Sequence, residues 1–355
     1  MKRRPCRVAS ALLVLALGVG GCMFFSGTEA VIEVDVVTGV VPLTIAFDGT
    51  GSTANSGIST YHWWFGTEDE STDATGTYTY DDVGEYTLTL TVRSESGKSD
   101  TAHVTITVEP AIWITDRNLD RIHKLDMQGG LERTIDLAYS EPTGVTLAEV
   151  NGATWLFVAC FNGGSQRILR VNPVTGEVAA AHTAPAQSPL QITYGAWGQK
   201  QLWHVDGLSR KIYRINPPDG HVYEAYGQTY FKATSPQVTN VTFLQTPQGL
   251  DWTSAPNAPG YLWYLEGETH LLYRIEIIPG YDIMSNTQLQ VEGDAVELPS
   301  EIFPVGAIDI VDDVLWAIDV NNHRLVEIDL ETGELTGTEI YGFPGSAPAG
   351  LEVQQ

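Results

Sequence analysis

One short sequence motif, which we call the aromatic word, recurs five times between residues 112 and 329, and no other feature limits the possible folds as strongly. Each copy starts with an aromatic residue, usually reaches an acid three residues later, crosses a polar turn and enters a second short strand. The five aromatic residues are Trp113, Phe157, Trp203, Trp263 and Trp316. A turn glycine follows the aromatic after 17 residues in four copies, and after 19 in the copy at Phe157. Repeats of this length that contain only short strands predict a β-propeller.

A second word precedes each aromatic word except the first, and it predicts how the propeller closes. It begins with a proline, and a glycine stands two residues later in four of its five copies, which start at Pro142, Pro189, Pro247, Pro304 and Pro348. We expect this word to form the innermost strand of each blade. The copy at Pro348 has no aromatic word after it, and the word at Trp113 has no innermost strand before it. The C-terminal strand therefore completes the first blade and closes a ring of five. A sixth, degenerate blade formed by residues 227–246 or 285–300 is the alternative.

Residues 1–22 have the pattern of an export signal. A positive segment that contains Lys2 and Arg7 precedes an apolar stretch too short to span a bilayer. The stretch ends in Val19-Gly-Gly-Cys22, which resembles the lipobox of bacterial lipoproteins. That resemblance implies lipidation of Cys22, with residues 23–29 as a tether. Met23, rather than Asp, stands after the cysteine, and by resemblance to sorting in Gram-negative bacteria this implies the outer membrane.

The charge and the remaining cysteine exclude some functions. Removal of residues 1–22 takes away four of the 19 Lys and Arg residues and leaves 15 cationic against 44 acidic residues, a net charge of −29. Such a surface argues against nucleic acid and against anionic lipid as partners. Cys160 is the only other cysteine besides Cys6 and Cys22. It ends an apolar strand, so we expect a buried structural thiol rather than a nucleophile.

Residues 30–109 have a different texture, rich in Thr and Ser with strict alternation. The run Tyr86-Thr-Leu-Thr-Leu-Thr-Val92 alternates polar and apolar residues, which is typical of strands with one buried face. About seven such strands predict a small β-sandwich. The segments 42–52, 61–66 and 78–92 resemble a PKD (polycystic kidney disease) domain. That family implies an extracellular spacer or interaction module and brings no catalytic residue.

Two positions depart from the PKD pattern and suggest a contact surface. The family usually has Asp after its core tryptophan and again after Phe-Gly, where this chain has Trp64 and Thr67. We expect Trp63 in the core, so alternation puts Trp64 on the opposite face together with His62. An exposed tryptophan beside a histidine is a candidate contact for a glycan or a protein. Coverage of Trp64 by a loop or by the neighbouring domain is the alternative.

The second domain, predicted for residues 111–355, begins after Glu109-Pro110. Its words resemble NHL-type and quinoprotein-like bacterial propellers, a resemblance that brings no activity. The sequence thus predicts an all-β chain: an Ig-like, PKD-like sandwich of residues 30–109 followed by the propeller. Repeated tryptophans are expected to wedge between blades, and repeated acids to accept hydrogen bonds from turn amides.

Three acids on the predicted innermost strands are candidate metal ligands. Asp251, Asp309 and Glu352 fall two or three residues after the glycines of their words. Carboxylates that converge around a narrow channel would bind Ca²⁺ or raise one another's pKa values. Separate satisfaction of each carboxylate by neighbouring amides is the alternative, and the sequence favours it.

Aromatic residues in and beside the long insertions are candidate ligand contacts. The repeat spacing rises from 44 to 60 residues across 226–246, and long loops on a rigid ring often bind partners. The predicted contact residues in the propeller are Tyr226, Tyr230, Phe231 and Trp252. Packing over an apolar seam is the alternative for these side chains.

Together these patterns favour a non-catalytic binding or scaffolding lipoprotein of the cell envelope. Its expected partner is a protein or a polysaccharide, and the protein is expected to be a monomer. The sequence has no Gly-x-Ser-x-Gly elbow, no His-Glu-x-x-His and no P-loop. A metal-dependent lyase or lactone hydrolase with its site in the central channel is the alternative, and a mechanical spacer is a third possibility.

Overall fold

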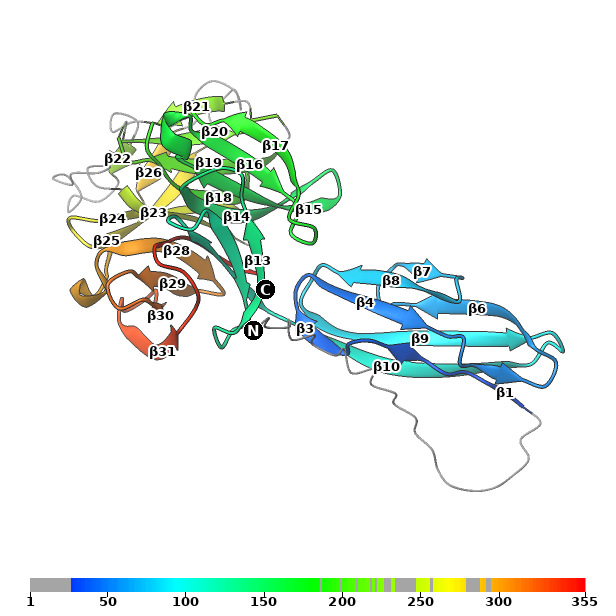
Figure 1. Ribbon diagram of the computed structural model, residues 1–355. Helices are drawn as coiled ribbons and strands as arrows, with labels where there is room; N and C mark the ends of the chain where they lie inside the picture. Colours follow the sequence, from blue (N-terminus) through cyan, green and yellow to red (C-terminus); the bar gives the residue numbers. More distant parts are fainter. Residues whose placement is uncertain are drawn as a thin grey trace, which may run out of the picture. The chain divides into compact units, whose positions relative to one another are not determined.

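A computed structural model describes residues 27–185, 187–197, 199–208, 210–217, 219–220, 222–226, 231–233, 247–255, 258–278, 288–291 and 295–354. The chain divides into two compact units, Met1–Pro110 and Ala111–Gln354 (Figure 1). Apart from short 3-10 turns such as Asn162–Gly164 and Ser300–Ile302, the regular structure of the described residues is β. The predicted all-β class is confirmed.

The N-terminal unit is a β-sandwich. Its larger sheet contains, in spatial order, β3 (Thr38–Val40), β10 (Ser99–Glu109), β9 (Gly84–Ser94), β6 (Ile58–Trp64) and β7 (Glu70–Ser71). Its smaller sheet contains β2 (Glu33–Val34), β4 (Leu43–Asp48) and β8 (Thr75–Tyr80), and β1 (Thr28–Glu29) pairs with β5 (Thr53–Ala54). The threonine alternation explains the pleat, because Leu88, Leu90 and Val92 are buried between partly exposed threonines.

Trp63 is the centre of the sandwich core, as the sequence predicts. Its side chain is fully buried, and its ring centroid lies 4.8 Å from that of Phe47. The indole N–H donates to the Asp73 carbonyl oxygen at 2.9 Å, so burial leaves no unsatisfied donor on this ring. Trp64, the next residue, consequently faces the other side of the sheet.

The second unit consists of five antiparallel blades, each with its innermost strand named first. The first blade is β32 (Pro348–Gln354), β11 (Ala111–Asp116), β12 (Arg121–Leu125) and β13 (Leu131–Asp136). The second is β14 (Pro142–Val150), β15 (Ala153–Cys160), β16 (Arg167–Val171) and β17 (Val178–Thr183). The third is β18 (Pro189–Trp197), β19 (Gln199–Asp206), β20 (Lys211–Ile215) and β21 (Val222–Tyr226).

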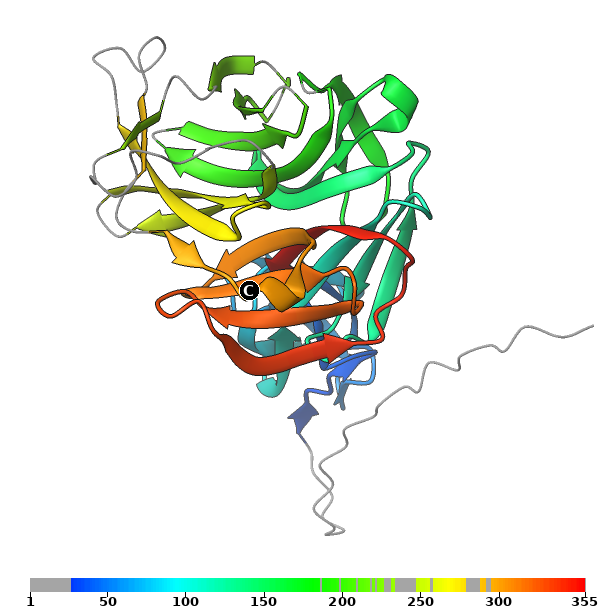
Figure 2. The ribbon, with the colours of Figure 1, turned by 90° about the vertical axis from the view of Figure 1, so that its left-hand side faces the viewer.

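The two remaining blades complete the set. The fourth is β23 (Pro247–Ala255), β24 (Ala258–Glu266), β25 (Leu271–Ile278) and β26 (Gln288–Val291). It is extended by β22 (Phe231–Ala233), which pairs parallel with β26, while β27 (Val296–Glu297) also pairs with β25. The fifth, orange to red in Figure 2, is β28 (Val305–Val311), β29 (Val314–Asp319), β30 (Arg324–Asp329) and β31 (Leu335–Tyr341). In the part of the chain that is described, no further sheet forms a sixth blade.

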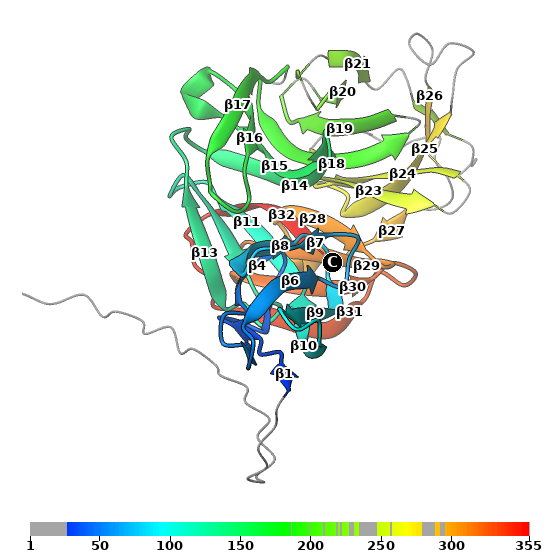
Figure 3. The ribbon, with the colours of Figure 1, turned by 90° about the vertical axis from the view of Figure 1, so that its right-hand side faces the viewer.

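The C-terminal strand closes the ring, as the repeat count predicts. β32 pairs antiparallel with β11, with Ile112 opposite Val353 and Trp113 opposite Glu352. Each innermost strand also contacts the next around the axis, in the order β14, β18, β23, β28, β32 and back to β14 (Figure 3). Closure leaves no innermost strand without neighbours on both sides, which removes an open seam in the ring.

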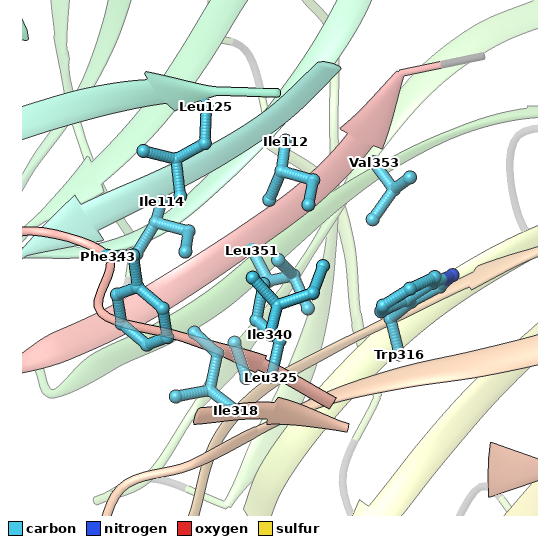
Figure 4. Close-up of a cluster of buried hydrophobic side chains, with 11 residues drawn as sticks. Ile112, Ile114, Leu125, Trp316, Ile318, Leu325, Ile340, Phe343, Leu351 and Val353 are labelled. Carbon is cyan, nitrogen blue, oxygen red and sulfur yellow. The ribbon is translucent and has the colours of Figure 1, made fainter. Parts of the chain in front are cut away.

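Apolar side chains fill the space between each pair of neighbouring blades. Five separate core clusters occupy the five interfaces. The closing interface joins Leu351 and Val353 of β32 to Ile112 of β11 and to Trp316 of the fifth blade (Figure 4). All five repeated aromatics lie in or against these clusters, so they wedge between blades as predicted. Truncation of such a buried aromatic typically costs about 3–5 kcal/mol.

Candidate functional site

Five equivalent positions, one on each innermost strand, meet around the propeller axis. Each stands opposite the repeated aromatic of its blade in the strand register. The residues are Thr146, Thr193, Asp251, Asp309 and Glu352. The three acids predicted from sequence therefore occupy three consecutive blades, and we call Asp251, Asp309 and Glu352 the acid ring.

Each member of the acid ring accepts a hydrogen bond from the next blade. Asp251 Oδ2 accepts from the Ile310 N–H at 2.7 Å, and Asp309 Oδ2 accepts from the Val353 N–H at 2.9 Å. Glu352 accepts from the Leu147 N–H and from the Thr146 hydroxyl. The inner edge of each blade carries N–H groups that no further strand satisfies, so these carboxyls replace a missing strand partner.

Burial in this narrow space raises the pKa values of the acid ring. Removal from water raises the pKa of Asp251 to about 7, against the hydrogen bond from the Thr193 hydroxyl, which is 2.8 Å from Oδ1. Burial is also the main cause of the raised pKa of Asp309, and the charges of Asp251 and Glu352 add to it. Burial and the charge of Asp251 raise the pKa of Glu352 to about 8. Glu352 keeps partial contact with solvent, whereas the two aspartates are only 4% and 5% exposed.

A buried glutamine occupies the centre near the start of the innermost strands, and it was not among the residues predicted from the sequence. Gln191 Oε1 accepts from the Leu250 N–H at 3.3 Å and the Ile308 N–H at 3.2 Å, while its Nε2 donates to the Ile308 carbonyl oxygen. Its own carbonyl oxygen lies 2.9 Å from His204 Nδ1, and burial lowers the pKa of His204 to about 4, so a neutral ring donates this bond. The available signal was Gln191 itself, where the other four copies of the word have glycine.

The described residues around the axis do not form a ligand set for the predicted calcium ion. Among the described residues, no three His, Cys, Asp or Glu side chains are grouped so that they could hold a metal ion. The backbone donors explain why, because each member of the acid ring turns an oxygen toward an N–H of the next strand. The acids meet at the axis, and cation binding by them stays a prediction.

Among the repeated acids at the ends of the aromatic words, Asp116, Asp206 and Asp319 accept hydrogen bonds from turn N–H groups, as predicted. Asp116 accepts from the Asn118 and Leu119 N–H groups at 2.9 and 3.0 Å, and from the Ser346 N–H at 2.6 Å. Asp206 is fully buried and accepts backbone N–H bonds from Gln187, Ser188 and Leu208. In the first and third blades these bonds fasten the turn to the loop that enters the innermost strand of the same blade, which is a structural role. Cys160 is likewise structural, since burial raises the pKa of its thiol to about 12.

The outer face of the larger sandwich sheet carries the second predicted site. Trp64 is 43% exposed, and it stands opposite Thr89 of β9 and Glu70 of β7. His62 stands opposite Thr91, and its Nε2 lies 3.0 Å from Glu70 Oε2. We call these five residues the Trp64 surface. Only Trp64 and His62 were predicted, because Glu70 joins them through a strand pairing that the sequence does not display.

The indole of Trp64 is fixed at its edge. Its Nε1–H donates to the Thr67 carbonyl oxygen at 2.6 Å, so the two positions that depart from the PKD pattern contact each other. The Thr67 hydroxyl in turn lies 2.9 Å from the Tyr78 hydroxyl, which donates to Asp69 at 2.8 Å. The loop between β6 and β7 is therefore cross-linked, and the exposed ring face is held in one orientation.

The other predicted contact residues are either packed or not described. Trp252 packs between blades, parallel to Trp203 with ring centroids 6.0 Å apart, and a Cβ on Gly195 would come within 2.1 Å of its ring. Trp252 therefore packs against a neighbouring blade while remaining partly exposed, and its role as a ligand contact stays a prediction. The backbones of Tyr226 and Phe231 end β21 and begin β22, while their side chains lie outside the described part of the chain. Tyr230 and Cys22 lie outside the described residues.

Comparison with known proteins identifies the first unit. The PKD domain family model matches residues 35–108. The pre-pro-metalloprotease PrtV of Vibrio cholerae is 35% identical over 81 residues, which are 23% of this chain and 9% of that protein. A crystal structure of the PKD1 domain of that protease is 36% identical with a TM-score of 0.21, and the match covers 23% of this chain and 96% of the domain. The match to the family model identifies residues 35–108 as a PKD domain.

A propeller-like neighbour covers more of the chain at lower identity. A quinoprotein alcohol dehydrogenase-like protein from Bacteroides thetaiotaomicron is 10% identical with a TM-score of 0.31, and the match covers 83% of this chain and 79% of that one. This likeness brings no activity with it. Within the described ranges, no helix has the length and apolar character that crossing a membrane requires.

Proposed function

We propose that this protein is an exported, lipid-anchored binding module of the cell envelope, and that its PKD domain holds a polysaccharide on the Trp64 surface. Trp64 carries the proposal, because a large aromatic ring is exposed on the outer face of a sheet and is held there by a hydrogen bond at its edge. An aromatic ring already fixed in orientation loses little conformational freedom when a ligand stacks on it.

The groups around the ring match the two kinds of surface that a sugar presents. The apolar C–H face of a pyranose can stack on the indole of Trp64. The hydroxyls at its rim then reach the exposed imidazole of His62 and the carboxylate of Glu70, whose side chains are 48% and 58% exposed. Threonine hydroxyls of β9 continue the polar surface beside the ring. Apolar stacking with hydrogen bonds at the rim is a usual design of small-molecule recognition.

In this proposal the propeller is a rigid scaffold. Its five blades are joined by five apolar clusters and by the closing strand β32, so it can present loops without moving. The anchor would be the lipidated Cys22, which holds the module at the membrane, and the outer membrane is the proposed location. No observation on the described residues favours the channel enzyme over the binding role.

Retention on insoluble polysaccharides tests the proposal. The chain without residues 1–22 is mixed with peptidoglycan sacculi, chitin and cellulose, and the bound fraction is measured against protein concentration. Trp64→Ala should weaken retention on the preferred polymer by roughly 10- to 100-fold, the usual cost of a lost aromatic contact of about 1.5–3 kcal/mol. Its thermal midpoint should stay at the wild-type value, because the side chain lies outside the core.

Leu208→Ala is the matched control. Leu208 is 64% exposed on the propeller, so this variant also removes a large exposed apolar side chain but leaves the Trp64 surface intact. It should bind like the wild type. Equal retention of Trp64→Ala and Leu208→Ala would sink the proposal, and so would a wild-type protein that none of the three polymers retains.

A further inference from the structure

Three carboxyl groups meet at the propeller axis, and within the described part of the chain no cationic side chain acts on their pKa values. The groups that act on the pKa values of the acid ring are one another, backbone N–H groups and the hydroxyls of Thr146 and Thr193. The other innermost strands contribute the neutral Gln191, and His204 behind it is a neutral ring. Full ionisation would place three negative charges in a narrow, water-poor space, which is strongly unfavourable.

The hydrogen bonds show which oxygen has room for a proton. Both oxygens of Asp251 accept bonds, one from Thr193 and one from Ile310. Glu352 accepts two bonds, from Leu147 and Thr146. Asp309 accepts at Oδ2 from the Val353 N–H, and within the described chain its Oδ1 receives no donor. A hydrogen on Asp309 Oδ1 would therefore displace no existing bond.

The same bonds flank the strand that closes the ring. Asp309 reaches β32 from the fifth blade, and Glu352 reaches from β32 to β14 of the second blade. The closing strand is thus held on both sides by carboxyls of the acid ring. Repulsion between ionised carboxyls would act directly on the two joints that make the propeller a closed ring.

A proton fits this arrangement better than a metal ion. The N–H groups of Ile310, Val353 and Leu147 point toward the carboxyl oxygens. Their positive ends occupy directions that a bound cation would need, and they repel it. A proton needs only one free oxygen, and Asp309 has one.

We propose that Asp309 holds a proton at neutral pH and that this proton keeps the ring closed at β32, so that the acid ring is a pH-sensitive closure. The direction of the pH effect follows from proton binding. Free carboxyls in the unfolded chain lose their protons near pH 4, whereas the folded ring keeps protons up to the raised pKa values, about 7 for Asp251 and about 8 for Glu352. Stability should therefore fall as pH rises through this window and level off above it.

Urea unfolding at several pH values tests the closure. The chain without residues 1–22 is unfolded between pH 5 and pH 9 in EDTA, and the fluorescence of its buried tryptophans is followed. For each proton that the fold retains, the unfolding equilibrium constant should rise about tenfold per pH unit. Asp309→Asn, which resembles the protonated acid, should unfold less readily than the wild type at pH 8 and should show a shallower pH dependence.

Asp313→Asn is the matched control. Asp313 is exposed in the turn between β28 and β29, so this variant removes one charge from the same blade without touching the ring. It should follow the wild-type pH dependence. Glu352→Gln is a second ring variant, expected to flatten the pH dependence even where Asp309→Asn gives no folded protein.

Three results would overturn the proposal. The first is a wild-type stability that does not fall between pH 5 and pH 8. The second is a ring variant with the full wild-type pH dependence. The third is a rise in the wild-type urea midpoint at pH 8 when Ca²⁺ replaces EDTA, abolished in Asp309→Asn, since a cation would then neutralise the ring.

Discussion

Replacement of Gln191 by alanine should weaken the propeller more than any single surface change. The side chain makes three hydrogen bonds to the backbone of two other innermost strands, two at Ile308 and one at Leu250. Each such bond contributes about 1 kcal/mol net, and its removal leaves a buried backbone group without a partner. Gln191→Ala should therefore cost about 3 kcal/mol, or roughly a hundredfold in the unfolding equilibrium constant.

Gln187→Ala is the matched comparison for this effect. Gln187 is exposed in the loop just before β18, and its hydrogen bonds to Asp206 and Gln166 use backbone atoms that alanine also has. The free energy of unfolding of Gln187→Ala should stay within about 0.5 kcal/mol of the wild-type value. Urea unfolding combined with hydrogen exchange of peptides from β18, β23 and β28 measures both variants and separates the propeller from the sandwich. Equal stability of the two variants would refute the role given to Gln191.

Gln191→Glu sharpens the same prediction. Glutamate keeps an acceptor for the Leu250 and Ile308 N–H groups but replaces the donor to the Ile308 carbonyl by an oxygen. Two acceptors then face each other without a proton, and a further charge joins the centre of the propeller. This variant should be less stable than the wild type and should lose more at pH 8 than at pH 5, where protonation restores the donor.

Two further predictions concern the anchor and the turns. Cys22→Ala should move the protein from the membrane fraction to the soluble fraction of fractionated cells, and unchanged membrane association would contradict the lipid anchor. Asp206→Ala should lower stability by roughly 3 kcal/mol, because it removes the acceptor of three backbone N–H groups, while Asp206→Asn should lose less since it keeps one acceptor oxygen. Equal losses in the two variants, measured by urea unfolding, would contradict that account.

Repetition made the architecture readable from the sequence. Five aromatic words predict five blades, and a C-terminal word without a successor predicts closure by the last strand, which β32 supplies. The acid ring was also readable, because Asp251, Asp309 and Glu352 fall at nearly the same offset in their words. A periodic pattern predicts which face of a strand a residue lies on. For these three acids, the position within the repeated word was enough to predict that they lie at the propeller axis.

Contacts between distant strands were not readable. Gln191 bonds to residues 59 and 117 positions later in the chain, and nothing local in its word indicates those partners. The aromatic character of Trp252 suggested a ligand contact, but its stacking on Trp203 and its close approach to Gly195 depend on strand packing that the sequence does not display. In the sandwich, the departures Trp64 and Thr67 were visible, but the hydrogen bond between them depends on how the loop turns.

The single glutamine of the innermost words is best understood together with the four glycines. A Cβ on Gly144 would come within 2.9 Å of the Gln191 Cα, and one on Gly350 would come within 2.7 Å of the Gly144 Cα. The innermost strands therefore approach so closely that side chains at all five positions would collide. Four glycines leave room for one side chain, and that side chain needs both a donor and an acceptor to satisfy the backbone around it. Glutamine has both, so this departure from the repeat helps to hold the innermost strands together. The departure from the PKD pattern at Trp64 instead leaves an aromatic ring facing solvent.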